Sequence, residues 1–407
     1  MNTNIGGPLK GIRVLDFTRA FSGPLCTMML AEFGADVIKV ENPKNPDETR
    51  TWPPFVGGEM SSYFSALNRN KRSAAIDLKT DGGRDAIFRM FSWADVVVEN
   101  FTPGVAERLG IDHVTARSVN ESLVYCSISG FGQDGPYRDR KGYDPVLQAM
   151  GGLMGVTGER DRGAVKSMIP IADYQAGSSA AIAILASIIR SKSTGKGEYI
   201  DIGMLDAMVA LTSTVGTAFL HDGKVPERSG TENPTRVPSS AFNCADGTLI
   251  QLVPNQQQWK RFCEVLDLPQ LVDDVRFATN LDRIAHQAEL YPILRERFLE
   301  RSSDEWLEVL TASGIPAGPI YTLDKLFVDP QVIHRDMVAS LDHPTAGPMK
   351  AIKLPYRMQE APTSISKHPP AIGEHTVEAL VTAAGYSRQE ALQIISSGIA
   401  AQTSTMR

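Results

Sequence analysis

The chain has 407 residues, of which 42% are hydrophobic and 22% are charged, and its formal net charge at pH 7 is −6. This composition excludes a disordered or fibrous protein, and the length predicts either two domains or one large α/β unit. The negative net charge argues against a general binder of nucleic acids or anionic membranes, although local basic clusters could hold a phosphorylated small molecule.

Cysteine usage and the apolar segments narrow the class further. The four cysteines, Cys26, Cys126, Cys244 and Cys263, form no CxxC pair and have no histidine at zinc-like spacing. We therefore expect neither a disulfide scaffold nor a metal site. The first residues contain no apolar segment of signal-peptide length, and the most apolar stretch, about ten residues near 180–189, is too short to cross a bilayer. The sequence thus predicts a cytoplasmic enzyme.

The N-terminal half predicts a parallel, Rossmann-like α/β sheet. Short apolar runs bounded by turn residues predict strands at 12–17, 35–41, 73–80, 95–101 and 123–132. Helices are predicted between them, one at 23–33 that ends at Gly34 and another at 82–94. No GxGxxG follows the first strand, where RAFSGP stands instead, so a dinucleotide-binding function lacks its main support.

The second half predicts a smaller α+β domain between two parts of the large one. One long helix is expected at 203–222, and the Gly/Pro/Ser-rich segment 223–240 is the best linker candidate. After it, a β-hairpin is expected at 241–253, with helices at 255–267, 284–300, 303–312, 375–385 and 387–398. We assign residues 1–222 to the first part of the large domain, 223–325 to the small domain, and 326–407 to a linker and a C-terminal return to the large domain.

Asp173 stands where the extended apolar run 167–172 meets a long Ala/Ile-rich helix. Asp is a favoured N-cap residue, and a helix N-terminus stabilises negative charge. The same position would suit a carboxylate nucleophile, because the small residues Ala176, Gly177 and Ser178 would let a substrate approach and backbone amides could stabilise an oxyanion. Spacing alone favours the cap and leaves the nucleophile open.

Segments along nearly the whole chain are similar, in the same order, to class III coenzyme A transferases of the formyl-CoA transferase/carnitine dehydratase type. They are LKGIRVLDFTRAFSGP, GADVIKVENP, LNRNKRSAAIDLK, ADVVVENFTPGVAERLG, GFGQDGPYRDRKGYDPVLQAMGGLMGVTG, ADYQAG, GKGEYIDIGMLDA and GIPAGPI. The resemblance implies that Asp173, the Asp of the DxxAG element, attacks the acyl-CoA thioester and carries CoA as an aspartyl thioester. It also implies an interlocked homodimer, with CoA or acyl-CoA as substrate and no permanently bound cofactor.

The resemblance further implies a set of CoA-binding residues. The motifs that line the CoA site in relatives contain Lys71, Arg72, Asn100, Phe101, Arg108 and Lys141. Clustered Lys and Arg are suited to phosphate groups. Lys71 and Arg72 would otherwise form a solvated charge cluster, and Arg108 would otherwise cap a helix.

Two departures from the formyl-CoA transferases bear on specificity. Those enzymes carry His-x-Gln in the first loop, where this chain has Arg19-Ala20-Phe21, and a glycine-rich loop in the small domain, where segment 252–259 has no glycine. Arg19 or Arg236 could instead bind the second carboxylate of a larger acid, although a surface role for Arg236 stays open. The segments GPYRDRKGYDPVLQAMGGLMGVTG and GIPAGPI resemble the dicarboxylate-using members of the family more than the oxalate-using ones, and this resemblance implies transfer of CoA from succinyl-CoA to a dicarboxylate.

Two alternative functions share part of this sequence pattern. The α-methylacyl-CoA racemases share the expected fold, but their catalytic His is replaced here by Tyr143, which we expect near the substrate. A Tyr with a pKa near 10 is a poor acceptor of an α-proton at neutral pH. A catalytically silent CoA-binding protein is the second alternative, and the intact Asp173 argues against it.

Overall fold

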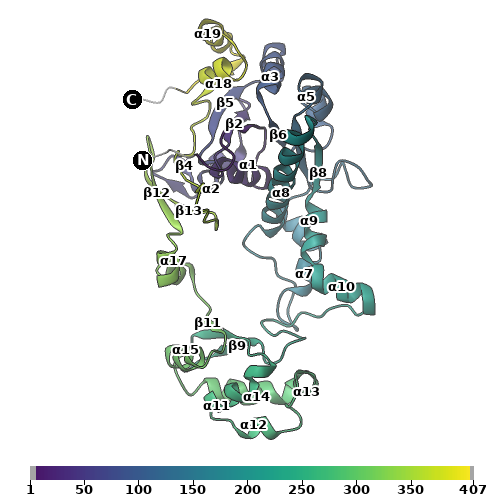
Figure 1. The fold of residues 1–407 in the computed structure, drawn as a ribbon, viewed down its shortest axis with the longest axis vertical. Coiled ribbons are helices and arrows are strands. Elements are labelled where there is room, and N and C mark those ends of the chain that lie inside the picture. The colour runs from purple at the N-terminus through teal and green to yellow at the C-terminus, as the bar shows by residue number, and fades with distance from the viewer. Residues whose placement is uncertain (1–5, 404–407) are drawn as a thin grey trace. The chain divides into compact units, whose positions relative to one another are not determined.

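The computed structural model describes residues 6–403, which divide into two compact units (Figure 1). The larger unit runs up to Leu153, continues through Lys166–Asp222, and resumes from Asp336 onward. The smaller unit consists of Met154–Val165 and Gly223–Arg335. The boundary after residue 222 coincides with one in the sequence-based division. The chain returns to the larger unit after Arg335 instead of 325, and the short segment 154–165 is part of the smaller unit.

A seven-stranded sheet forms the centre of the larger unit, in the order β14-β5-β2-β1-β6-β7-β8. Its strands are β1 (Arg13–Asp16), β2 (Asp36–Glu41), β5 (Arg72–Ile76), β6 (Val96–Glu99), β7 (Val124–Ser129), β8 (Tyr199–Gly203) and β14 (Ala400–Ala401). All neighbours pair in parallel except β14, which runs antiparallel to β5. The predicted mostly parallel α/β sheet is confirmed. Its strand order reverses between β1 and β6, where sheets of this kind form a crevice beyond the carboxyl ends of the strands.

Helices cover both faces of this sheet, so its strands are buried on both sides. One face packs against α1 (Ser22–Glu32), α8 (Ile171–Thr194) and α9 (Met204–Leu211), and the other against α3 (Asp81–Trp93), α5 (His113–Val119), α18 (Thr376–Thr382) and α19 (Arg388–Ser396) (Figure 1). Adjacent residues of β1 show the alternation, because Val14 joins the first core and Leu15 the second.

The remaining elements of the larger unit are short. They are η1 (Glu48–Thr51), β3 (Phe55–Val56), β4 (Met60–Ser61), α2 (Ser62–Asn68), α4 (Val105–Leu109), α6 (Asp144–Met150), α10 (Ser213–Asp222), β12 (Val338–His343) and β13 (Gly347–Ile352), with α7 (Leu153–Val156) at the boundary. The prediction of one helix over 203–222 is wrong. The Thr212 hydroxyl donates to Val209 O over 2.7 Å, and α9 and α10 meet there at an angle of 74°.

The smaller unit has its own sheet and core. Strands β9 (Ser240–Asn243), β10 (Leu249–Leu252) and β11 (Ala317–Pro319) form an antiparallel sheet, and the predicted hairpin turns at Gly247, whose φ is 76°. Its helices are η2 (Gln256–Gln258), α11 (Trp259–Val265), α12 (Gln270–Asp273), α13 (Asn280–Ala285), α14 (Gln287–Phe298), α15 (Ser303–Ala312), α16 (Leu323–Leu326) and α17 (Pro330–His334). Among the described residues, no single helix meets the length and hydropathy required for a membrane span, although α9 and α10 meet them jointly.

Lys71 lies inside the larger unit and not at its surface. Its ammonium donates to Asp16 Oδ2 over 2.9 Å, to Asn68 Oδ1 over 2.9 Å and to Pro24 O over 3.0 Å, and the side chains of Lys71 and Asp16 are both fully buried. Burial alone would raise the pKa of Asp16, but Lys71 and Lys39 hold that pKa below its ordinary value. With its donors engaged in the core, Lys71 has none left for a CoA phosphate, which contradicts the sequence-based expectation.

Replacement of Lys71 by Met should therefore destabilise the fold, because it leaves the Asp16 carboxylate buried beside one cation fewer. We expect a loss of about 3–5 kcal/mol in the free energy of unfolding, measured by urea denaturation. Lys350, which is exposed on β13, is the matched control, and Lys350→Met should change stability by less than about 0.5 kcal/mol. A Lys71→Met protein that keeps its stability but loses affinity for CoA would restore the original assignment.

Candidate active site

A cavity of about 610 Å³ lies in the larger unit at the carboxyl ends of β1, β6 and β7. This is the point where the strand order of the sheet reverses. Six of the residues predicted from the sequence line this cavity together: Arg19, Asn100, Phe101, Lys141, Tyr143 and Asp173. They come from the segments that follow β1, β6 and β7 and from the first turn of α8, so residues that are distant in the sequence share one cavity.

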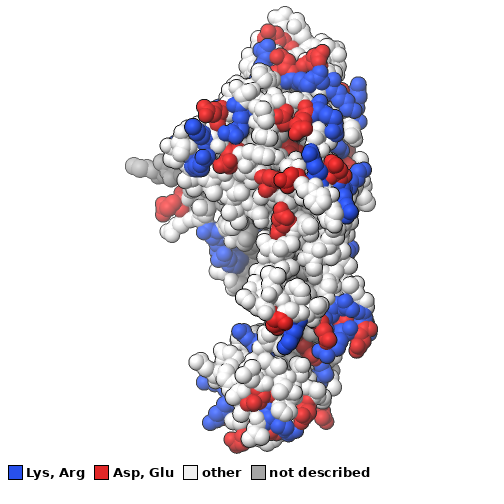
Figure 2. All heavy atoms as spheres, turned by 90° about the vertical axis from the view of Figure 1, so that its right-hand side faces the viewer, with Lys and Arg blue, Asp and Glu red and all other residues white. Residues whose placement is uncertain are grey.

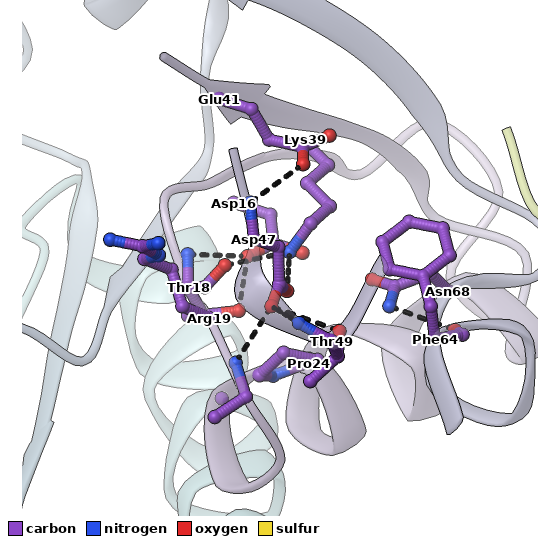
Figure 3. Close-up of polar contacts among 12 residues, drawn as sticks. Asp16, Thr18, Arg19, Pro24, Lys39, Glu41, Asp47, Thr49, Phe64 and Asn68 are labelled. Atoms are coloured by element: carbon purple, nitrogen blue, oxygen red, sulfur yellow. Dashed lines mark hydrogen bonds and ion pairs between the residues drawn. The ribbon is translucent and has the colours of Figure 1, made fainter. Parts of the chain in front are cut away.

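Buried charges hold the loop that follows β1 (Figure 3). The Lys39 ammonium donates to Thr18 O over 2.6 Å and pairs with Asp47 Oδ2 at 3.0 Å. Asp47 in turn accepts a hydrogen bond of 3.2 Å from the Ala20 N–H through Oδ1. Ala20 has a φ of 63°, a conformation that a residue with a Cβ rarely adopts, and these bonds offset its cost.

Asn100 fixes the same loop from the end of β6. Its side chain accepts from the Arg19 N–H and donates to Arg19 O, each over 2.8 Å. The Arg19 guanidinium donates through Nη2 to Pro46 O over 2.6 Å, whereas its Nε is buried and has no hydrogen-bond partner. Arg19 therefore lines the cavity from a loop that is held at both ends, and its buried Nε is unpaired.

Asp173 is the third residue of α8, whose N-cap is Pro170, so the expectation that Asp173 caps the helix is wrong. Asp144 performs that role, because its Oδ1 accepts a hydrogen bond of 2.9 Å from the Ala172 N–H. The other oxygen of Asp144 accepts from Gln148 Nε2 over 2.7 Å. The Asp173 carboxyl is thereby left for the cavity.

Burial raises the pKa of Asp173 to about 7, and the nearby Asp144 carboxylate adds to the shift. Hydrogen bonds from the backbone and side chain of Ser22 act in the opposite direction. Gly177 permits this contact, because a Cβ there would meet Ser22 O at 2.4 Å. The sequence analysis predicts that the small residues Ala176 and Gly177 let a substrate approach. In the structure both are buried, so they allow α1 to approach α8 and form no open path for substrate.

Aromatic residues that the sequence analysis did not identify form another part of the wall. Phe21, Trp52 and Tyr63 line the cavity, and the Tyr63 ring lies 5.9 Å from that of Phe21 and 4.9 Å from that of Trp52. Burial, followed by the charge of Asp173, raises the pKa of Tyr63 to about 12, so this phenol stays protonated. No spacing in the sequence connects these rings, because they meet only when η1 and α2 pack beside the loop after β1.

Comparison with known proteins identifies the family. The profile of CoA-transferase family III matches residues 9–376. This chain belongs to CoA-transferase family III. It is 38% identical over 399 residues to succinyl-CoA:glutarate CoA-transferase of Homo sapiens, and the alignment covers 98% of this chain and 91% of the relative. It is also 38% identical over 379 residues to succinate–glutarate CoA-transferase of Agrobacterium fabrum, and the alignment covers 92% of this chain and 95% of the relative.

A solved structure agrees with this assignment. The crystal structure of a CAIB/BAIF family protein from Brucella suis matches with a TM-score of 0.82 and 37% sequence identity, covering 93% of this chain and all of that one. The chain is therefore a family III CoA-transferase with the fold of its relatives, and the resemblance inferred from its motifs is confirmed.

The other predicted residues of this CoA-transferase lie outside the cavity. Arg72 is nearly buried and forms salt bridges with Asp36 at 2.6 Å and Glu378 at 3.1 Å, in a separate pocket of about 400 Å³. Asp36 and Arg72 are the first residues of β2 and β5, so this pocket lies at the amino ends of the strands, whereas the cavity lies at their carboxyl ends. The structure therefore contradicts a role for Arg72 in the cavity. Arg108 is exposed on α4, one turn beyond the lining residues.

Two features of the smaller unit also do not line the cavity. Arg236 is not among the lining residues. Segment 252–259, which stands in place of a glycine-rich loop, forms η2 with a capping box between Asn255 and Gln258, and Gln258 donates to Gly314 O over 2.5 Å. The segment is thus an ordered turn that is fixed by its own side chains.

The raised pKa of Asp173 predicts a specific pH dependence. A carboxylate must be ionised to attack a carbonyl carbon, so kcat/KM should fall about tenfold per pH unit below about pH 7.

The same raised pKa predicts an effect on stability. Because the pKa of Asp173 is higher in the folded state than in the unfolded chain, ionised Asp173 lowers the stability of the fold above about pH 7. Asp173→Asn should therefore raise the melting temperature at about pH 8, and this gain should shrink as the pH falls toward about 4.

Asp139→Asn is the matched control for this prediction, because Asp139 is 88% exposed. It should leave both the pH profile and the melting temperature unchanged. A transfer rate that is flat from about pH 5.5 to 8, or an Asp173→Asn protein whose stability follows that of the wild type at every pH, would contradict the assignment of the titrating group.

Proposed function

We propose that this CoA-transferase moves CoA from succinyl-CoA to a dicarboxylic acid and that Asp173 is its covalent nucleophile. The carrying observation is that the Asp173 carboxyl, which is partly buried and has no cation among the groups that shift its pKa, lines one cavity together with the partly unpaired Arg19 guanidinium. The names of the two relatives support the same donor and an acceptor with two carboxylates. Among the described residues no histidine lines the cavity, which disfavours a racemase that needs a His/Asp pair.

The proposed reaction balances without any further reagent. An Asp173 oxygen attacks the thioester carbonyl carbon of succinyl-CoA, the C–S bond breaks, and CoA leaves as thiolate. The thiolate attacks the Asp173 acyl carbon of the mixed anhydride, which releases succinate and forms an aspartyl-CoA thioester. The acceptor carboxylate displaces the thiolate from Asp173, and the thiolate then attacks the acceptor's acyl carbon and frees Asp173. Aromatic walls at the cavity suit these steps, because both intermediates hydrolyse in water.

We assign the recognition of the ligands to two groups of cations. Arg140, Lys141 and Lys166 line the cavity and would hold the CoA phosphates. Arg19 is held on the loop after β1 by Asn100 and Pro46, and its guanidinium group would donate to the distal carboxylate of the acceptor. A monocarboxylate would leave this cation without a partner in the cavity, which is the costlier state.

The acceptor assay tests both proposals with succinyl-CoA as donor and either glutarate or pentanoate as acceptor. Wild type should prefer glutarate by kcat/KM on the order of 30-fold or more. Arg19→Ala should lose most of this preference by losing activity toward glutarate. Arg19→Lys keeps the positive charge but not the bidentate donor geometry of a guanidinium, so its preference should lie between those of Arg19→Ala and the wild type. Asp173→Asn should be inactive with both acids. A wild-type preference for pentanoate, or an unchanged ratio in Arg19→Ala, contradicts the role of Arg19.

We also propose that the protein is an interlocked homodimer. The helices α8, α9 and α10 expose large apolar side chains, including Ile189 at 73% and Leu220 at 82%. Figure 2 shows this side of the molecule, where a wide area of the larger unit carries few charged side chains. Exposed apolar surfaces of this kind mark protein–protein interfaces more often than free surface.

The oligomeric state provides the corresponding test. Light scattering should show a dimer that persists on dilution, and loss of the dimer should coincide with unfolding in denaturant, because threaded chains cannot separate while folded. The double variant Ile189→Asp/Leu220→Asp should impair assembly. Leu392→Asp, at a half-exposed position on α19, should not. A folded, active monomer at low concentration would rule out the interlocked architecture.

A further inference from the structure

The carboxyl end of β6 carries a second buried acid, which the proposed reaction does not use. Glu99 is the last residue of β6 and is 2% exposed. The sheet register places it opposite Ser127 of β7, and Ser127 in turn is opposite Asp201 of β8. These three residues form a polar row across neighbouring strands, directly before the segment that lines the cavity.

Glu99 holds the start of that segment. Its Oε2 accepts a hydrogen bond of 2.7 Å from the Phe101 N–H, and its carboxyl also hydrogen-bonds with Ser127. The Ser127 hydroxyl accepts a further bond of 3.3 Å from the Tyr199 hydroxyl. Because Asn100 to Pro103 line the cavity, the Glu99 carboxylate fixes the turn through which the chain passes from the sheet into the cavity wall.

No cation offsets the charge of Glu99 among the groups that act on it. Burial raises the pKa of Glu99 to about 7 and Asp201 adds to the shift, whereas the bonds from Ser127 and Phe101 act in the opposite direction. The other titratable neighbours on β7 and β8 are Tyr125, Cys126 and Tyr199. On the side of β1, the neighbouring contact is the bond from the Phe17 N–H to Val98 O. Ionised and neutral Glu99 are thus both populated near neutral pH.

We propose that Glu99 is a positioning residue for the CoA ligand: its ionised carboxylate holds the wall from Asn100 to Pro103 in the binding conformation, and its protonation weakens CoA binding. A hydrogen bond to a carboxylate is stronger than one to a neutral carboxyl group, so the Phe101 N–H is held less firmly after protonation. This inference rests on the proposed function, because it requires CoA to occupy the cavity.

The test measures the Kd of dephospho-CoA, the ligand in every binding measurement below, by calorimetry from about pH 6 to 8.5. The parent is the Asp173→Asn protein, and it is compared with the same protein carrying Glu99→Gln. Dephospho-CoA lacks the titrating 3′-phosphate, and Asp173→Asn removes the other raised carboxyl. At about pH 8.5 the Glu99→Gln change should weaken binding about fivefold, and near pH 6 the two proteins should bind alike. A merely structural role would weaken binding by the same factor at every pH.

Proton exchange provides a second readout that does not depend on the Glu99→Gln variant. Binding near pH 7 should release protons from the parent protein, so the binding enthalpy should vary with the ionisation heat of the buffer. Glu107→Gln, at an exposed position on α4, is the control and should behave as the parent. A parent that binds no CoA overturns the proposed function. A parent that binds CoA without proton release, or with a constant ratio to Glu99→Gln, overturns the role of Glu99 alone.

Discussion

The buried ion pairs beneath the loop after β1 are the constraint on which the active site depends. Lys71 pairs with Asp16 and Lys39 with Asp47, and all four side chains are fully buried. Removing such charges from water is costly, and the cost is offset only while every partner is in place. Through Lys39 and Asp47, this network determines the path of the backbone around Ala20, and hence where Arg19 and Ser22 enter the cavity.

The pKa values of buried carboxyl groups shift in opposite directions according to whether a cation is near. Lys39 holds the pKa of Asp47 down at about 2 although burial opposes this. Burial without a cation instead raises the pKa values of Asp173 and Glu99 to about 7. The first kind of carboxylate stays ionised and supports the fold, whereas the second kind can change its charge at neutral pH. Carboxyl groups perturbed by desolvation in a cavity are candidates for function on physical grounds.

Close backbone approach joins the two halves of the site. Gly177 lies against Ser22 O, where a Cβ would be only 2.4 Å away, and this contact brings α1 and α8 together beside Asp173. Asn100 similarly ties the end of β6 to the loop after β1 through paired hydrogen bonds. Asp173, its hydrogen-bond donors on Ser22 and the Arg19 side chain therefore come from separate elements, and the position of each depends on packing between them.

The parallel sheet, the hairpin at Gly247 and the family could be predicted from the sequence, because the spacing of apolar residues, the turn residues and the family motifs are local signals. The motifs also singled out Asp173 and Arg19, and both line the cavity, although their roles stay predictions. Three other features depend on contacts between distant segments: Lys71 is buried against Asp16, Arg72 lies in a pocket at the amino ends of the strands, and Asp144 caps α8 in place of Asp173. Adjacent residues at a strand end point to opposite sides, so the basic pair in NRNKRS could not be assigned to one site from its spacing. The pKa values of Asp47, Asp173 and Glu99 could not be predicted from the sequence either, because burial and neighbouring charge are properties of the folded chain.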